Sequence, residues 1–269
     1  MRLSVSTLTC PMWDAGEVSS FLRSVGIDHV DLRSIGGRTD LWDIDELTSD
    51  GPFREHGITV DGISTSVRIG SDRVTGSSPD GERELAQCAE LCARLGGKYL
   101  RVFAGDKDDA HAGATPAEVF KRIGRVYRNL CARADEYGID VLVETHDVVS
   151  ASGDVLSLIE ATDHARAGIV WDVRHPLHQA GESFEFTAEK LRDVVRLVHV
   201  KDFTGPPEYE LVEFGTGIID AEKLVSILVS IGYDGSIVLE QPRIASTGKP
   251  APEPNITGFA AAFLPHVAR

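Results

Sequence analysis

Four side chains able to bind a metal ion follow four apolar segments in the second half of the chain. Each stands at or beside the end of a short β-branched run, and they are Glu144, Asp172, His199 and Glu240. In each run the residue two positions earlier is apolar. Because side chains in a strand alternate with a period of two, the polar group shares a face with an apolar one. If these strands are neighbours in a parallel barrel, the four side chains converge at its mouth.

Three crowded carboxylates and one imidazole have the chemistry of a metal site. The carboxylates repel one another and raise one another's pKa, and a divalent cation removes that cost. Oxygen ligands with one nitrogen suit Mn²⁺ or Mg²⁺, while Co²⁺ and Zn²⁺ are further candidates. One acid after a strand is usually a helix cap, and one histidine is usually a core side chain, but four in succession favour a site. We therefore predict one bound divalent ion, with Mn²⁺ as the expected one.

Two kinds of segment alternate along the chain and would position these side chains. Short apolar runs predict strands at 3–8, 28–33, 58–64, 98–104, 140–146, 168–173, 195–201 and 235–240. Between them apolar residues recur at helical spacing, most clearly over 119–130. Thr115 with Glu118 predicts a capping box at a helix start, and Asp14 and Asp220 are further N-cap candidates. Glycines mark the expected helix ends.

Eight strand-helix units in series, with no linker between them, predict an α/β fold. We expect a (β/α)₈ TIM barrel that forms a single domain over residues 1–269. An open doubly wound sheet would also alternate strands with helices. Such a sheet carries a glycine-rich phosphate loop after its first strand, whereas residues 9–13 here read TCPMW, so the dinucleotide fingerprint is absent.

Composition and charge argue against several partners. The formal net charge is −15, so an acidic surface would repel nucleic acid and anionic lipid. No apolar run approaches the roughly 20 residues that a membrane-spanning helix needs, and residues 1–6 lack the apolar core of a signal peptide. We expect a cytoplasmic protein without nucleic-acid or membrane partners. Cys88 and Cys92 belong to a helical apolar stripe and are predicted to pack in the core.

At the expected strand ends, the sequence resembles the xylose isomerase-like TIM barrels, also called the sugar phosphate isomerase/epimerase superfamily. The resemblance covers nearly the whole chain. The motifs that carry it are ETH at 144–146, WDVRH at 171–175, HVKD at 199–202, GTGIID at 215–220 and LEQP at 239–242. It implies that the four side chains described above are metal ligands, and that His175 contacts the substrate.

The resemblance implies a metal-dependent isomerase or epimerase that acts on a small sugar or polyol-like, carbohydrate-like substrate. Such reactions remove a proton from a weakly acidic C–H beside a carbonyl, through an enediolate that the metal stabilises. Glu144 and Glu240 would flank the substrate and move the proton. The ketose 3-epimerase branch tends to have a glutamate and an arginine where this chain has Ser150 and Gly205. Simple 3-epimerisation of a free ketose is therefore not implied.

Other residues favour the alternative of a metal-dependent lyase. It would be similar to an inosose or dehydroshikimate dehydratase, or to an enzyme that cleaves a C–O or C–C bond of an oxidised glycoside. The dehydroshikimate dehydratase branch places a histidine, a lysine and an arginine where this chain has His146, Lys201 and Arg101. His146 is then a candidate base, and Lys201 and Arg101 are candidate substrate-binding residues. Asp202 is a candidate partner for the preceding lysine or for the metal-binding histidine. Trp13 is a candidate substrate-binding residue that would stack against an apolar sugar face.

Two further classes of protein fit the sequence less well. Endonuclease IV, a DNA-repair enzyme, shares this barrel but needs additional histidines, which residues 64–66, 103–105 and 214–216 do not supply. A non-catalytic binding barrel would not need both glutamates at the strand ends. Barrels of the family that the sequence resembles often dimerise, so a homodimer is expected.

Overall fold

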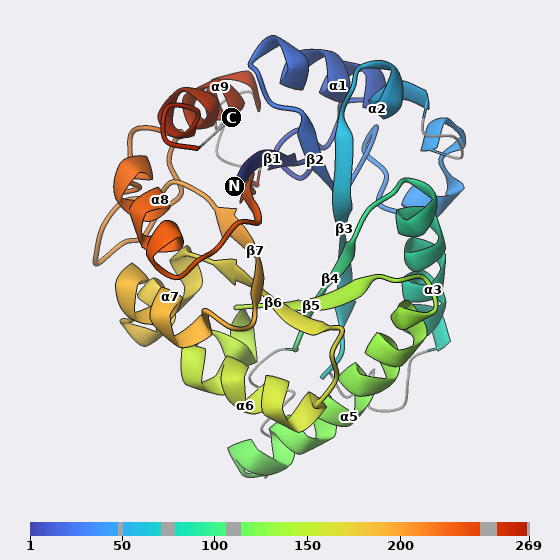
Figure 1. Ribbon diagram of the computed structural model, residues 1–269, viewed down its shortest axis with the longest axis vertical. Coiled ribbons are helices and arrows are strands. Elements are labelled where there is room, and N and C mark those ends of the chain that lie inside the picture. The colour runs from blue at the N-terminus through green and yellow to red at the C-terminus, as the bar shows by residue number, and fades with distance from the viewer. Residues whose placement is uncertain (48–50, 71–78, 106–113, 243–251, 268–269) are drawn as a thin grey trace. The chain divides into compact units, whose positions relative to one another are not determined.

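The computed structural model describes residues 1–47, 51–70, 79–105, 114–242 and 252–267. The strands of these residues follow one another in sequence order around a closed barrel, in which β8 pairs in parallel with β1. Figure 1 shows the strands and helices coloured from blue at the N-terminus to red at the C-terminus. They are β1 (Arg2–Ser6), β2 (His29–Leu32), β3 (Thr59–Arg68), β4 (Tyr99–Phe103), β5 (Asp140–Glu144), β6 (Ala167–Asp172), β7 (Val195–Val200) and β8 (Ser236–Leu239). The predicted (β/α)₈ fold is confirmed, and every predicted strand overlaps an observed one.

Helices alternate with the strands along the chain. They are α1 (Ala15–Ser24), α2 (Gly51–Glu55), α3 (Pro79–Arg94), α5 (Pro116–Asp135), α6 (Ser152–Thr162), α7 (Phe184–Leu191), α8 (Ala221–Ser230) and α9 (Pro252–Phe263). Short 3₁₀ turns are η1 (Leu41–Asp43), η2 (Asp45–Leu47) and η3 (Asp147–Val149), and η4 (Pro176–Ala180) is a π-helical turn. Within the described ranges, no helix is both long and apolar enough to cross a membrane.

Side-chain caps begin the helices where the sequence predicts them. Thr115 accepts a hydrogen bond from the Glu118 backbone N–H, and the Glu118 carboxylate accepts one from the Thr115 N–H, which completes the capping box of α5. Asp14 and Glu17 form the same reciprocal pair at α1. Asp220 caps α8 through a backbone N–H of the first turn. These contacts satisfy donors that have no partner inside the helix.

The chain forms two compact units. The first unit comprises Met1–Asp61 and Leu197–Arg269, and the second comprises Gly62–Arg196. In the first unit β1 pairs with both β2 and β8, and β7 pairs with β8. In the second unit β3, β4, β5 and β6 pair in that order. That residues 1–269 form a single domain stays a prediction.

The second unit has a core in which one phenol joins a helix to two strands. The buried Tyr127 hydroxyl of α5 lies 2.5 Å from the backbone oxygen of Val141 in β5 and 2.8 Å from that of Gly168 in β6. Burial raises the pKa of Tyr127 well above its ordinary value, so the phenol stays protonated and donates. Cys88 and Cys92 are buried on α3, as predicted.

Replacing Tyr127 with phenylalanine should lower the free energy of unfolding by about 1–3 kcal/mol. The change keeps the ring but removes the donor from buried backbone oxygens, which are then left without that hydrogen bond. Urea unfolding followed by circular dichroism would measure the difference. Tyr137→Phe is the matched control, because Tyr137 is exposed and its substitution should change stability little. Equal effects of the two substitutions would contradict the prediction.

Candidate metal and substrate site

In the second unit, two carboxylates stand at the carboxyl ends of neighbouring strands. Glu144 is the last residue of β5 and Asp172 the last of β6, and both side chains are buried. Glu144 lies in register with Val170, two residues before Asp172. Because side chains of a strand alternate between faces, residues two apart point to the same side. Because both residues stand at strand ends in this register, both carboxylates face the same mouth of the barrel.

In the first unit, a histidine and a third carboxylate are adjacent at the ends of β7 and β8. His199 lies in β7, in register with Val238, and Glu240 directly follows β8. His199 Nδ1 is 3.5 Å from Glu240 Oε2, and both side chains are buried. The two residues thus repeat at this strand pair the arrangement of Glu144 and Asp172.

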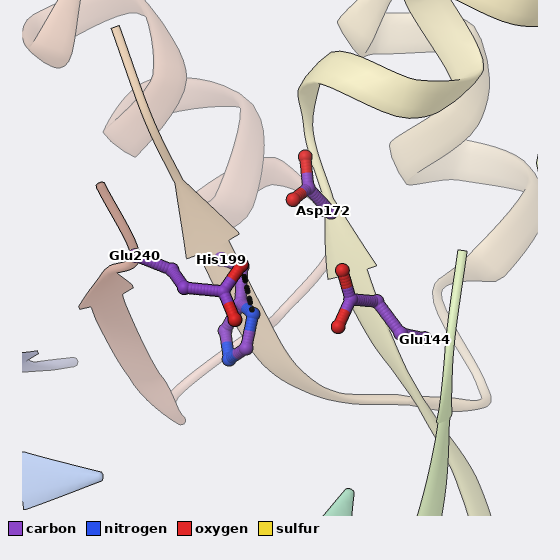
Figure 2. A group of neighbouring side chains, drawn as sticks. All are labelled: Glu144, Asp172, His199 and Glu240. Carbon is purple, nitrogen blue, oxygen red and sulfur yellow. Dashed lines mark ion pairs between the residues drawn. The ribbon is translucent and has the colours of Figure 1, made fainter. Parts of the chain in front are cut away.

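The four side chains predicted to converge do lie together. One ligand atom from each of Glu144, Asp172, His199 and Glu240 lies within 4.8 Å of every other (Figure 2). Three carboxylates and one imidazole fit a hard or borderline divalent ion, for which oxygen and imidazole nitrogen are suitable ligands. The group could therefore hold a divalent metal ion.

Two buried cations partly balance the carboxylates. Arg101 Nε of β4 is 3.3 Å from Glu144 Oε2, and Lys201 Nζ is 3.0 Å from Glu240 Oε2. Since two positive side chains face three negative ones, a net negative charge remains within this set of five groups if His199 is neutral. A divalent cation would reverse that sign, which suits a substrate that becomes anionic during reaction.

Asp202 binds a loop of the first unit instead of the two neighbours that the sequence suggested for it. Its carboxylate accepts hydrogen bonds from the backbone N–H groups of Phe203, Gly215, Gly217 and Ile219, at 2.8–3.2 Å. The ammonium group of the preceding lysine contacts a glutamate of the site, as described above. The prediction that Asp202 would pair with His199 or Lys201 is therefore wrong, because the loop's donors surround the buried carboxylate.

Two histidines predicted to take part in the reaction pack against each other at a tilted angle in the second unit. The His146 and His175 ring centroids are 4.2 Å apart, and the His175 Nε2 is 3.7 Å from Asp172 Oδ2. Burial lowers the pKa of His146, but the carboxylates of Asp147, Glu144 and Asp172 outweigh this effect and raise it above the ordinary value. His175 thus lies beside Asp172, and the charges of Glu144 and Asp172 act on His146.

Trp13 lies in the turn after β1, where the sequence places it. Its half-buried ring packs edge-on against Phe21 of α1, with centroids 5.2 Å apart. This contact gives the indole a structural partner. That the exposed part of the ring contacts a sugar stays a prediction.

Sequence reasoning missed Asp147 and Arg68. Asp147 Oδ1 is 2.8 Å from His146 Nδ1, and Asp147 Oδ2 accepts a hydrogen bond of 2.7 Å from Arg68 Nη1 at the end of β3. The acidic residue directly after the ETH motif was a visible signal for Asp147. No sequence signal pointed to Arg68, because its contact with Asp147 depends on how β3 pairs with β4.

One known family matches most of the chain. The family described as xylose isomerase-like TIM barrel matches residues 21–265. A curated relative, the ketose 3-epimerase of Arthrobacter globiformis, is 27% identical over 234 residues, which are 81% of this chain and 74% of the relative.

Solved structures share the same architecture. The IOLI protein with a bound zinc atom is 19% identical, with a TM-score of 0.82, and the match covers 100% of both chains. The probable 3-DHS dehydratase AsbF of Bacillus anthracis, involved in petrobactin synthesis, is 16% identical, with a TM-score of 0.78 over 96% of this chain and 98% of that one. At these identities the likeness is one of fold.

Proposed function

The chain belongs to the xylose isomerase-like TIM barrel family, and from this premise we propose that it is a divalent-metal-dependent isomerase or epimerase of a sugar or polyol-like substrate. The chain is an enzyme, as its ketose 3-epimerase relative indicates. The observation that carries the proposal is the buried group of three carboxylates and one histidine, whose ligand atoms lie within 4.8 Å of one another.

The proposed chemistry is the transfer of a proton at a carbon beside a carbonyl. A bound divalent ion supplies positive charge that makes this C–H more acidic. Glu240 and Glu144 are buried, so their carboxylates can act on a proton with little competition from water. One takes the proton from the substrate, and the other returns a proton to the neighbouring carbon or to the opposite face. Arg101 and Lys201 hold these carboxylates in place.

Four side chains are proposed to bind the substrate. Lys201 and Arg101 would contact substrate oxygens while they pair with Glu240 and Glu144, and His175 would donate or accept a hydrogen bond from beside Asp172. Trp13 would pack against an apolar sugar face. A small carbohydrate fits such a set, because it offers several hydroxyl groups and few charges.

The alternative is a metal-dependent lyase, in which His146 takes the proton and water leaves. His146, Lys201 and Arg101 favour it, and the likeness to the probable 3-DHS dehydratase agrees at the level of fold. Mass spectrometry of products from free ketoses, inososes and oxidised glycosides separates the two. Products of unchanged mass support the isomerase or epimerase, whereas loss of one water from the substrate would replace it with the lyase.

Purified protein should hold about one divalent ion per chain, and EDTA should remove it together with the activity. We propose Mn²⁺, with Zn²⁺ as the leading substitute because a structural neighbour binds zinc. Asp172→Asn should weaken metal binding about tenfold or more, since it removes an anionic ligand. Elemental analysis after dialysis measures the bound metal, with Asp163→Asn, which lies outside the site at the C-terminal cap of α6, as control. A metal-free wild type with full turnover would refute the site.

The setting of the enzyme is also a proposal. We place it in the cytoplasm as a homodimer that acts on small molecules, without nucleic-acid or membrane partners. The formal net charge of −15 supports the last point, because it opposes binding to polyanions.

A further inference from the structure

The turn after β5 has a backbone conformation that few side chains adopt. Asp147 has φ of +50°, in the left-handed region that favours glycine and that aspartate tolerates better than most residues. In an extended chain, the side chains of consecutive residues point to opposite sides. The left-handed turn instead brings the Asp147 carboxylate back to the residue before it, where Oδ1 lies 2.8 Å from His146 Nδ1.

Arg68 fixes the other oxygen of this carboxylate. Its Nη1 donates to Asp147 Oδ2 over 2.7 Å, and it stands at the end of β3, in register with Phe103 just after a shift in the strand pairing. The Arg68 guanidinium carbon is 5.2 Å from the centre of the Phe103 ring. Asp147 is therefore held from two sides, with one oxygen for the arginine and one for the histidine. Burial raises the pKa of Asp147, but His146 and Arg68 lower it to about 2.

The His146 ring has little freedom to turn. Phe103 packs edge-on against it at 5.1 Å, and His175 packs against it at 4.2 Å between centroids. The contact between Nδ1 and Asp147 has the length of an ion pair, although it is not a well-aligned hydrogen bond. A carboxylate oxygen 2.8 Å from Nδ1 attracts a proton on that nitrogen and repels an unshared electron pair there, so the neutral ring carries its proton on Nδ1. The lone pair of the neutral imidazole is then on Nε2.

We propose that Asp147, held by Arg68, is a positioning residue that fixes the ring orientation and the Nδ1-protonated tautomer of His146, so that Nε2 accepts a hydrogen bond from a substrate hydroxyl. This role rests on the proposed function, because it needs a hydroxylated substrate at the site. The role of Asp147 adds one requirement to the proposed function: the substrate must have a hydroxyl group that lies beside the carboxylates of Glu144 and Asp172. A carboxylate behind a histidine often sets its tautomer in this way.

The second unit offers a matched control for the test. Asp163 also has a left-handed backbone, with φ of +46°, and also pairs with an arginine, Arg128, over 2.6 Å. It caps the C-terminus of α6, and among the residues that the structure describes its ion-pair partner is Arg128 and not a histidine. Asp147→Gly and Asp163→Gly therefore remove the same groups, and glycine accepts both backbones without strain. A loss seen only in Asp147→Gly reports its effect on His146.

The tautomer of His146 can be measured without a substrate. In Zn²⁺-loaded protein labelled with ¹⁵N-histidine, the imidazole resonances of His146 are identified by their disappearance in His146→Gln. We expect the Nδ1-protonated pattern in wild type and in Asp163→Gly, and a shift toward the Nε2-protonated pattern in Asp147→Gly. An unchanged His146 pattern in Asp147→Gly would overturn the proposal, and so would an equal shift in Asp163→Gly.

Kinetics then test the consequence. Asp147→Gly should lower kcat/KM about 10–100-fold with unchanged metal content, while Asp163→Gly stays near wild type. Asp147→Asn should recover part of the loss, because its amide oxygen can still accept from Nδ1. A normal kcat/KM in Asp147→Gly with a shifted tautomer would overturn the substrate contact. If wild type turns over no hydroxylated carbonyl compound, the proposed function fails, whereas the tautomer result still stands on its own.

Discussion

Replacing Glu240 with glutamine should slow exchange of a substrate C–H with D₂O by about 10²–10⁴-fold while the protein still binds a metal ion. The glutamine side-chain oxygen can remain a weak ligand and can still accept from Lys201, whose ammonium group is 3.0 Å from the glutamate. The amide has no basic oxygen to take the proton, so the proton-transfer step is slowed. Nuclear magnetic resonance follows the exchange and does not require the product to be known.

Two further variants interpret this result. Glu136→Gln on the surface removes the same charge outside the site and should exchange at the wild-type rate. His146→Ala should retain substantial exchange if the enzyme is an isomerase or epimerase. If His146→Ala abolishes exchange while metal-loaded Glu240→Gln exchanges normally, the base is the histidine and the lyase becomes the better assignment.

Asp202→Ala should lower the free energy of unfolding by about 2–4 kcal/mol. The substitution leaves four backbone N–H groups, which the buried carboxylate now binds, without that acceptor. Asp202→Asn should lie between wild type and alanine, because its amide has one oxygen to accept with. Urea unfolding measures both variants.

The control for Asp202 is Asp220, a carboxylate that accepts a backbone hydrogen bond as a helix N-cap. Asp220 caps α8 by accepting a hydrogen bond from the Lys223 N–H, so Asp220→Ala should cost about 1 kcal/mol. Gly217→Ala should imitate Asp202→Ala from the other side, because a Cβ at Gly217 would collide with Asp202 Oδ1. If Asp202→Ala were no more harmful than Asp220→Ala, the carboxylate would not be the organiser of this loop.

The sequence was sufficient for the barrel and for the grouping of four polar side chains. Both predictions depend on local sequence patterns. Runs of β-branched residues predict the strands, and the residue at the end of each strand predicts which side chain lies at the barrel mouth. Glu144 and Asp172 end their strands, and His199 and Glu240 lie at or beside the ends of theirs. Whether these four bind a metal stays a prediction that needs the measurement above.

The partners of individual side chains were harder to predict, because they depend on backbone turns. The sequence predicts that Asp202 pairs with nearby residues of the HVKD motif, but the loop folds so that its backbone N–H groups donate to the carboxylate. The GTGIID motif was visible, and its glycines supply two of those donors, but only the fold shows what they bind. Arg68 and Asp147 are 79 positions apart, and a left-handed turn decides where the aspartate points.

The first unit is made of two stretches of chain that are far apart in sequence, and this limits when it can fold during synthesis. Its β1 pairs with β8, with Leu3 opposite Ile237, so this pairing waits until β8 has left the ribosome. The second unit is one continuous stretch, Gly62–Arg196, and its strands can pair earlier. The long loop that β1 and β8 close carries an entropic cost that local pairing avoids. During translation, therefore, the carboxylates of β5 and β6 can be in place before the histidine and glutamate of β7 and β8 have been synthesised.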